Sequence, residues 1–321
     1  MPSPPRIWTL SDRHAGNRNQ ASALAVALGG AERHVELAFP APWRWLAPHL
    51  VAGAEARLPA PVADALAHRP PEIAIGCGRQ AALALLALRR LASRPIFTVQ
   101  ILNPRVAPGA FDRVIVPRHD DLTGANVIQS TGALHSIDSA WIAQAAAEFP
   151  QWAKLPRPLL VVLIGGPHRH AALDPPAIER LGAELNIHRC ERGGSIYLVG
   201  SRRTPIALHA PLRELARTLD AGVWLSEGDG PNPYRGLLAQ ADLLLVSADS
   251  VGMLSEACAL GVPVASFSAY PLTGKLARFD AALRAEGLLS DLHHPRAPST
   301  PLRETPLIAA QVLAAWRDTL G

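Results

Sequence analysis

Residues 243–263 constrain the fold of this 321-residue chain more than any other stretch. They begin with four apolar residues in a row, 243–246, which is typical of a strand buried on both faces. Ser247, Asp249 and Ser250 form a polar cluster that supplies N-cap side chains for a helix that begins near Ser250. Gly261 is expected to end that helix before the next apolar run. The stretch therefore predicts a strand, a polar turn, a helix and a second strand.

The polar turn of this unit is a predicted ligand site. Such turns lie at the carboxyl edge of a parallel sheet, where α/β proteins bind ligands. The helix N-terminus offers free N–H groups and a positive dipole end, which suit a phosphate. Glu256, about a turn and a half into the helix, is placed to accept hydrogen bonds from the two hydroxyls of a ribose. The alternative is that Glu256 only solvates an exposed helix face, and its spacing alone does not decide between the two.

The strand–helix–strand pattern recurs in both halves of the chain. The length suits two domains, and the proline-rich residues 149–158 are the best boundary between them. We therefore expect an N-terminal Rossmann-like domain over residues 1–150 and a C-terminal one over residues 157–321, with the last helix able to pack back on the N-terminal domain. The predicted fold is α/β, with two facing Rossmann-like domains and an interdomain cleft.

Composition narrows the class of protein further. Hydrophobic residues make up 49% and charged residues 18% of the chain, as in a well-buried globular protein. The net charge is +4, and basic residues are interspersed with acids, which argues against a nucleic-acid partner but leaves an anionic substrate open. Three scattered cysteines, no long apolar run and no signal peptide predict a cytoplasmic protein. Peripheral contact with the inner membrane stays open, and Trp43 and Trp45 would be candidates for a lipid or sugar contact if they prove exposed.

The spacing of Glu256, Gly261 and Pro263 resembles the donor-nucleotide motif of glycosyltransferases with the GT-B fold. In those enzymes the matching Glu holds the ribose of a nucleotide sugar. Many retaining members carry a second Glu eight residues later, where this chain has Val264. The resemblance is therefore to the single-Glu, mostly inverting branch.

Motifs along nearly the whole chain resemble the elongated-mitochondria (mitochondrial fission) protein family of plants and bacteria. They are Ser11-Asp12 with Ala15-Gly16-Asn17-x-Asn19-Gln20, Gly76-x-Gly78-Arg79, Val99-Gln100-Ile101-Leu102-x-Pro104-Arg105, Phe111-Asp112, Pro117-x-His119-Asp120, Gly132-Ala133-Leu134-His135, Gly165-Gly166, Ser201-Arg202-Arg203-Thr204-Pro205, Asn232-Pro233-Tyr234, Asp249-Ser250, and Met253-x-Ser255-Glu256. The family's fold resembles the glycosyltransferases above, and its bacterial members are treated as glycosyltransferase-like proteins. The plant role in organelle division does not carry over to a bacterial chain.

The resemblance, together with the positions at strand ends, assigns candidate sites in both domains. The expected nucleotide-binding residues are Gly165, Gly166, Ser201, Arg202, Arg203, Thr204, Asn232, Tyr234, Asp249, Ser250, Met253, Ser255 and Glu256. The expected acceptor-side residues are Gly16, Asn17, Gly78, Arg79, Arg105, His119 and His135. Asp12 and His14 are the candidate catalytic residues. Because the family usually has Lys at the position of His14, we place Asp12 ahead of His14 as general base.

The predicted function is metal-independent, inverting transfer of a sugar from a nucleotide diphosphate sugar to an unknown acceptor of the cell envelope, with no cofactor. One alternative is a nucleotide-sugar 2-epimerase, which uses a similar fold but needs more acidic groups near the sugar than the sequence offers. The other is a nucleotide-binding or membrane-associated interaction protein without catalysis.

Overall fold

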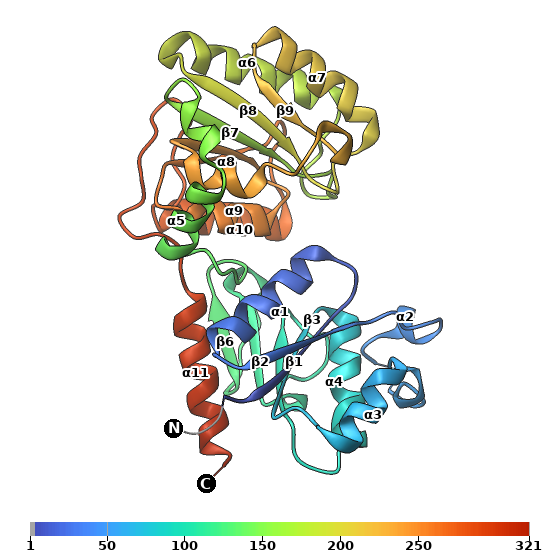
Figure 1. The fold of residues 1–321 in the computed structure, drawn as a ribbon. Helices are drawn as coiled ribbons and strands as arrows, with labels where there is room; N and C mark the ends of the chain where they lie inside the picture. The colour runs from blue at the N-terminus through green and yellow to red at the C-terminus, as the bar shows by residue number, and fades with distance from the viewer. Residues whose placement is uncertain (1–3, 50, 321) are drawn as a thin grey trace. The chain divides into compact units, whose positions relative to one another are not determined.

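The computed structural model describes residues 4–49 and 51–320, and the chain divides by its contacts into two compact units (Figure 1). The N-terminal unit comprises Met1–Ser136 and Glu304–Gly321, and the C-terminal unit comprises Ile137–Arg303. Each unit is a parallel sheet with helices on both faces. The prediction of an α/β protein with two Rossmann-like domains is confirmed.

The N-terminal unit is built on a six-stranded sheet in the order β2-β1-β3-β4-β5-β6. Its elements are β1 (Arg6–Ser11), α1 (Ala15–Ala27), β2 (Ala31–Glu36), α2 (Trp43–Leu46), η1 (Glu55–Arg57), α3 (Ala60–His68), β3 (Ile73–Cys77), α4 (Arg79–Leu91), β4 (Phe97–Ile101), η2 (Pro108–Ala110), β5 (Arg113–Pro117), η3 (Arg118–Asp120), β6 (Val127–Ser130) and α11 (Thr305–Asp318). Helices α1 and α11 pack together on one face, and α2, α3 and α4 cover the other. Strand β3 is buried at every residue because helices cover both faces.

The C-terminal unit is built on a five-stranded sheet in the order β11-β10-β7-β8-β9. Its elements are α5 (Ser139–Glu148), η4 (Pro150–Lys154), β7 (Leu159–Ile164), α6 (Pro175–Arg192), β8 (Ser195–Gly200), η5 (Ile206–Leu208), α7 (His209–Thr218), β9 (Gly222–Trp224), η6 (Glu227–Asp229), α8 (Tyr234–Gln240), β10 (Leu243–Ser247), α9 (Val251–Cys258), β11 (Val264–Phe267) and α10 (Gly274–Ala285). Helices α6 and α7 cover one face, and α5, α8, α9 and α10 cover the other.

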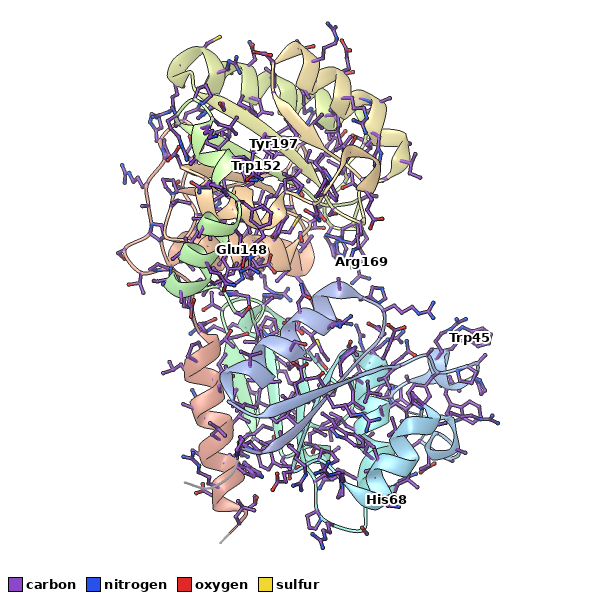
Figure 2. All side chains as sticks on the ribbon, in the orientation of Figure 1. Trp45, His68, Glu148, Trp152, Arg169 and Tyr197 are labelled. Carbon is purple, nitrogen blue, oxygen red and sulfur yellow. The ribbon has the colours of Figure 1, made fainter. Side chains whose placement is uncertain are left out.

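The boundary between the units lies at Ser136, not in the proline-rich residues 149–158 where the sequence analysis placed it. Helix α5 belongs to the C-terminal unit because it packs on α8. There the Arg235 guanidinium lies 5.2 Å from the centre of the Trp141 ring and 3.5 Å from the Glu148 carboxylate. The proline-rich segment is also packed, since the Trp152 ring meets the Tyr197 ring edge-on at 5.2 Å (Figure 2). The proline-rich segment therefore lies inside the C-terminal unit and is not a linker between the two units.

Three helices, α2, α3 and α6, were not predicted from the sequence. Helix α6 carries ordinary boundary signals: Asp174 caps its N-terminus by accepting a 2.9 Å hydrogen bond from Ala177 N, two prolines follow, and Gly193 follows its last residue at a φ of 64°. Its apolar residues are too evenly mixed with charges to show a clear helical stripe. No helix in the described part of the chain has the length and apolar character needed to cross a membrane.

Candidate functional site

Three neighbouring strands of the C-terminal sheet, β10, β7 and β8, end side by side. They run parallel, so their carboxyl ends share one edge. The segments that leave them are Gly165–Gly166 after β7, Ser201–Thr204 after β8, and Ala248–Ser250 after β10. Most of the residues predicted to bind nucleotide therefore meet at this edge, which we call the donor edge. The sequence could not show this meeting directly, because β10 and β7 are far apart in the chain.

Asp249 holds the donor edge together. Its Oδ2 accepts hydrogen bonds from Gly166 N at 3.0 Å and from the Arg203 guanidinium at 2.6 Å. Its Oδ1 accepts from Ser247 Oγ at 2.6 Å, and that hydroxyl oxygen in turn accepts from Gly165 N at 2.7 Å. The side chain is only 3% exposed, so these donors compensate a buried charge. Asp249 therefore connects the three segments of the donor edge, and its carboxylate oxygens are already occupied by hydrogen bonds from the protein.

Gly165 and Gly166 are required by the protein's own packing. A Cβ on Gly165 would lie 2.2 Å from Asp249 Oδ2, and one on Gly166 would lie 2.2 Å from Arg203 O. Thr204 fixes the adjoining turn, because its Oγ1 accepts from Ser201 N at 2.8 Å and lies 2.7 Å from Gly165 O. Both glycines were predicted to belong to the nucleotide-binding residues. The structure supplies a reason that needs no ligand.

The two adjacent arginines of the donor edge have different partners. Arg203 is paired with Asp249, whereas Arg202 is exposed and makes no hydrogen bond or ion pair with the residues that the structure describes. Arg169, on the outside of the loop after β7, is likewise exposed (Figure 2). An unpaired guanidinium at the end of parallel strands suits an anion such as a diphosphate. Arg202 is therefore the arginine of the pair that can bind a ligand without breaking an existing ion pair.

Helix α9 presents one face beside the donor edge. Ser250 is its N-cap, with Oγ accepting from Met253 N at 3.4 Å. Gly252 and Met253 lie four and three residues before Glu256, so each neighbours Glu256 on the helix surface. A Cβ on Gly252 would have no atom within 4 Å. Ser255 points elsewhere: it is fully buried and donates to Val251 O at 2.7 Å. The predicted nucleotide-binding residues of α9 are thus divided between an open face and the core.

Tyr234 positions the Glu256 carboxylate. Its hydroxyl donates to Glu256 Oε2, and its own N–H is accepted by Asn232 Oδ1 at 2.9 Å. Glu256 Oε1 has no hydrogen-bond partner within residues 4–49 and 51–320. Burial raises the pKa of the Glu256 carboxyl, and the bond from Tyr234 works against that shift. Burial, with the neighbouring carboxylate, raises the pKa of Tyr234 well above its usual range. Glu256 is thus a half-buried carboxylate with one oxygen free to accept a hydrogen bond.

The cost of burying Glu256 predicts a pH-dependent effect of Glu256→Gln. The raised pKa means that the folded protein binds the proton more tightly than the unfolded chain. The group therefore contributes stability at low pH, and this is lost as pH rises from the unfolded value through the folded pKa. We expect Glu256→Gln to gain stability relative to wild type as pH rises from 4 to 7, measured by urea unfolding. A matched variant, Glu179→Gln on the exposed side of α6, should follow wild type throughout. A Glu256→Gln difference that shrinks with rising pH would contradict this account.

In the N-terminal unit, Asp12 and His14 form a pair after β1. Asp12 Oδ1 accepts from His14 N at 3.1 Å and from Asn17 Nδ2 at 2.9 Å, and its Oδ2 lies 3.0 Å from His14 Nδ1. The His14 side chain is 79% exposed, whereas that of Asp12 is mostly buried. A carboxylate that holds Nδ1 orients the imidazole and leaves Nε2 as the outward basic atom. The geometry favours His14 as base and Asp12 as its positioning residue, the reverse of the order given by the sequence.

Most of the predicted acceptor-side residues also follow neighbouring strands. Gly78 after β3 has a φ of 90°, and a Cβ on it would lie 2.8 Å from Asn17 Nδ2, so the exits of β1 and β3 touch. Gly16 lies in the first turn of α1. Arg79, Arg105 and His119 follow β3, β4 and β5, and both arginines are exposed. His135 is different, because it is 7% exposed and its N–H donates to Thr305 Oγ1 at the start of α11. It anchors the returning helix.

The fold is that of GT-B glycosyltransferases and nucleotide-sugar epimerases. The chain resembles a putative UDP-N-acetylglucosamine 2-epimerase from Listeria monocytogenes with a TM-score of 0.57 and 14% identity, covering 98% of this chain and 97% of that one. It resembles the UDP-GlcNAc 2-epimerase of Methanocaldococcus jannaschii with a TM-score of 0.54 and 12% identity, covering 96% and 99%. It resembles the glycotransferase of kitacinnamycin with a TM-score of 0.52 and 14% identity, covering 99% and 95%. At these identities the likeness shows the fold alone.

The chain belongs to the mitochondrial fission ELM1 family, whose model matches residues 15–316. It is 34% identical to mitochondrial fission protein ELM1 of Arabidopsis thaliana over 244 residues, which cover 68% of this chain and 56% of that protein. The chain thus spans little more than half of the plant relative. It is 25% identical over 304 residues to an uncharacterized protein of Rickettsia prowazekii, covering 83% of each. The family resemblance inferred from the sequence motifs is confirmed.

Proposed function

We propose that this protein transfers a sugar from a nucleotide diphosphate sugar to an acceptor, with the C-terminal unit binding the donor. The observation that carries the proposal is the donor edge, where Arg202 has no partner among the described residues and the neighbouring α9 presents Glu256 with a free Oε1. A guanidinium beside a helix N-terminus suits a diphosphate. A carboxylate oxygen accepts hydrogen bonds from ribose hydroxyls. Structures of related fold bound to UDP-GlcNAc support the same class of donor.

The proposed reaction is a single displacement. An acceptor hydroxyl attacks the anomeric carbon, the bond from that carbon to the diphosphate breaks, and His14 Nε2 takes the hydroxyl proton while Asp12 holds the ring. Negative charge grows on the leaving diphosphate as the bond breaks. Arg202 and the N-terminus of α9 stabilise that charge more in the transition state than in the bound donor. No step requires a metal ion, and inversion follows from direct attack.

Titration calorimetry with nucleoside diphosphates tests the donor edge. We expect wild type to bind one of uridine, guanosine or cytidine diphosphate, and Arg202→Gln to bind it about 10- to 100-fold more weakly, since hydrogen bonds to charged groups are worth about 1.5–3 kcal/mol. The control is Arg217→Gln, which removes an arginine that pairs with Glu214 on the surface of α7. Equal affinity of Arg202→Gln and Arg217→Gln would remove Arg202 from the site. No binding of any of the three would overturn the donor edge itself.

A further inference from the structure

A lobe of the N-terminal unit carries two exposed apolar side chains that the proposed transfer does not use. It comprises α2 and the turn through η1, that is residues 40–49 and 51–57 (Figure 1). Trp45 is 66% exposed and its neighbour Leu46 is 50% exposed. Figure 2 shows Trp45 at the outer edge of this lobe. Exposing two adjacent large apolar side chains to water costs free energy, and a partner that buries them would recover that cost.

The lobe holds these side chains on a packed base. Trp43 is partly buried against the core, and its Nε1 donates a hydrogen bond to Ala52 O at 3.0 Å. The Arg57 guanidinium lies over the Trp43 ring at 5.1 Å, and that of Arg44 lies over the Trp45 ring at 5.9 Å. Trp43 therefore anchors the turn, while Trp45 stands outward with an arginine beside it. An aromatic ring with a nearby cation matches the interface between lipid headgroups and acyl chains.

Charge singles out the same part of the chain. Residues 39–95, which hold α2, α3 and α4, contain seven arginines and three acidic residues, whereas the rest of the chain contains 24 basic and 24 acidic residues. The whole net charge of +4 thus lies in the segment that carries the lobe. All seven arginines are exposed. Two of the seven, Arg44 and Arg57, lie in the lobe itself, over the rings of Trp45 and Trp43. Guanidinium groups beside protruding apolar side chains are complementary to a membrane that contains anionic lipids.

We infer that this lobe, residues 40–49 and 51–57, docks the protein on an anionic lipid surface, with Trp45 and Leu46 entering the headgroup region. A second copy of the chain is a poorer occupant, because a two-fold interface would bring the Arg44 and Arg57 guanidinium groups of one copy against those of the other. A protein partner would need a pocket to take a protruding Trp, whereas a bilayer yields to it. This inference does not depend on sugar transfer, because it uses no residue of the donor edge or of the Asp12–His14 pair.

Co-sedimentation of the full chain with vesicles tests the lobe. We expect binding to vesicles of phosphatidylcholine with phosphatidylglycerol, little binding to phosphatidylcholine alone, and release as salt rises. Replacing both apolar side chains, Trp45→Ser with Leu46→Ser, should weaken binding at least about tenfold. Arg44→Gln with Arg57→Gln should weaken it and flatten the salt dependence. The control is Leu307→Ser on α11, where a leucine that is 69% exposed lies outside the lobe and binding should be unchanged.

Because Trp45 and Leu46 are exposed, the double variant should melt at the wild-type temperature, which separates lost binding from lost folding. Full vesicle binding by the double variant would overturn the inference. Equal binding to neutral and anionic vesicles would also overturn it. The same holds if wild type is a dimer in sedimentation velocity and the double variant is a monomer. Nucleotide titration of the double variant should match wild type, so failure of this inference is distinguishable from failure of the donor edge.

Discussion

Asp249→Ala should lower the free energy of unfolding of the C-terminal unit by about 2–4 kcal/mol. The substitution leaves Gly166 N without its acceptor and Ser247 Oγ without the carboxylate, both in the buried part of the donor edge. It also removes the partner of Arg203, but that side chain is half exposed, so water recovers part of the loss. Urea unfolding followed by far-ultraviolet circular dichroism measures the change.

Two companion variants make the Asp249 result specific. Asp249→Asn keeps an acceptor oxygen and loses only the charge, so it should fall between Asp249→Ala and wild type. Glu214→Ala removes an exposed carboxylate that pairs with Arg217 on α7, and it should barely move the urea midpoint. If Asp249→Ala unfolded at the same urea concentration as Glu214→Ala, the buried network could not be what holds the edge.

His14→Gln should lower the rate of sugar transfer by about 10²–10⁴-fold, the range typical for loss of a general base. Glutamine keeps a polar side chain of similar reach but cannot take a proton from the acceptor. Asp12→Asn should also slow transfer, because a side-chain amide does not hold the imidazolium that forms when His14 accepts the proton. Release of nucleoside diphosphate from donor in the presence of a cell-envelope extract measures both rates.

The neighbouring Arg13 provides the control for this pair. It is exposed and bonds Glu36 at 3.0 Å, away from the carboxylate of Asp12. Arg13→Gln should keep most of the activity, and nucleotide affinity should stay unchanged in all three variants because none touches the donor edge. Activity in His14→Gln equal to wild type, with Asp12→Asn inactive, would restore Asp12 as the base.

The sequence predicted the elements best where local signals agreed. The strand–turn–helix around Ser250 was expected because a continuous apolar run is followed by a capping side chain, and both features are local in the chain. Helix α6 was missed although Asp174 and Gly193 bracket it, because its charged residues obscure the apolar stripe. Helix α5 was placed in the wrong unit because the boundary was taken from the prolines that follow it. The packing of Trp141 and Ile142 against the C-terminal core shows where the helix belongs.

The candidate site depends on contacts that no local pattern encodes. Asp249 was expected to bind nucleotide, yet two of its three donors, Gly166 N and the Arg203 guanidinium, come from segments brought to it only by the order of strands in the sheet. Ser255 lies one residue from Glu256 but turns to the core, because successive helix residues point in different directions. The pairing of Asp12 with His14 Nδ1 likewise required side-chain geometry. The sequence could predict which residues lie at strand ends. It could not predict which of them bond to one another and which are left exposed.

Turnover of nucleotide sugars by wild-type protein tests the proposed function most directly. Uridine, guanosine and cytidine diphosphate sugars are incubated with and without a cell-envelope extract, and products are separated by chromatography and mass spectrometry. We predict release of nucleoside diphosphate and appearance of a glycosylated product only when extract is present, with both lost in His14→Gln. Formation of an epimer of the same mass without extract would identify an epimerase instead. Binding of a nucleotide with no donor consumed under any condition would contradict the proposal and leave a nucleotide-binding protein.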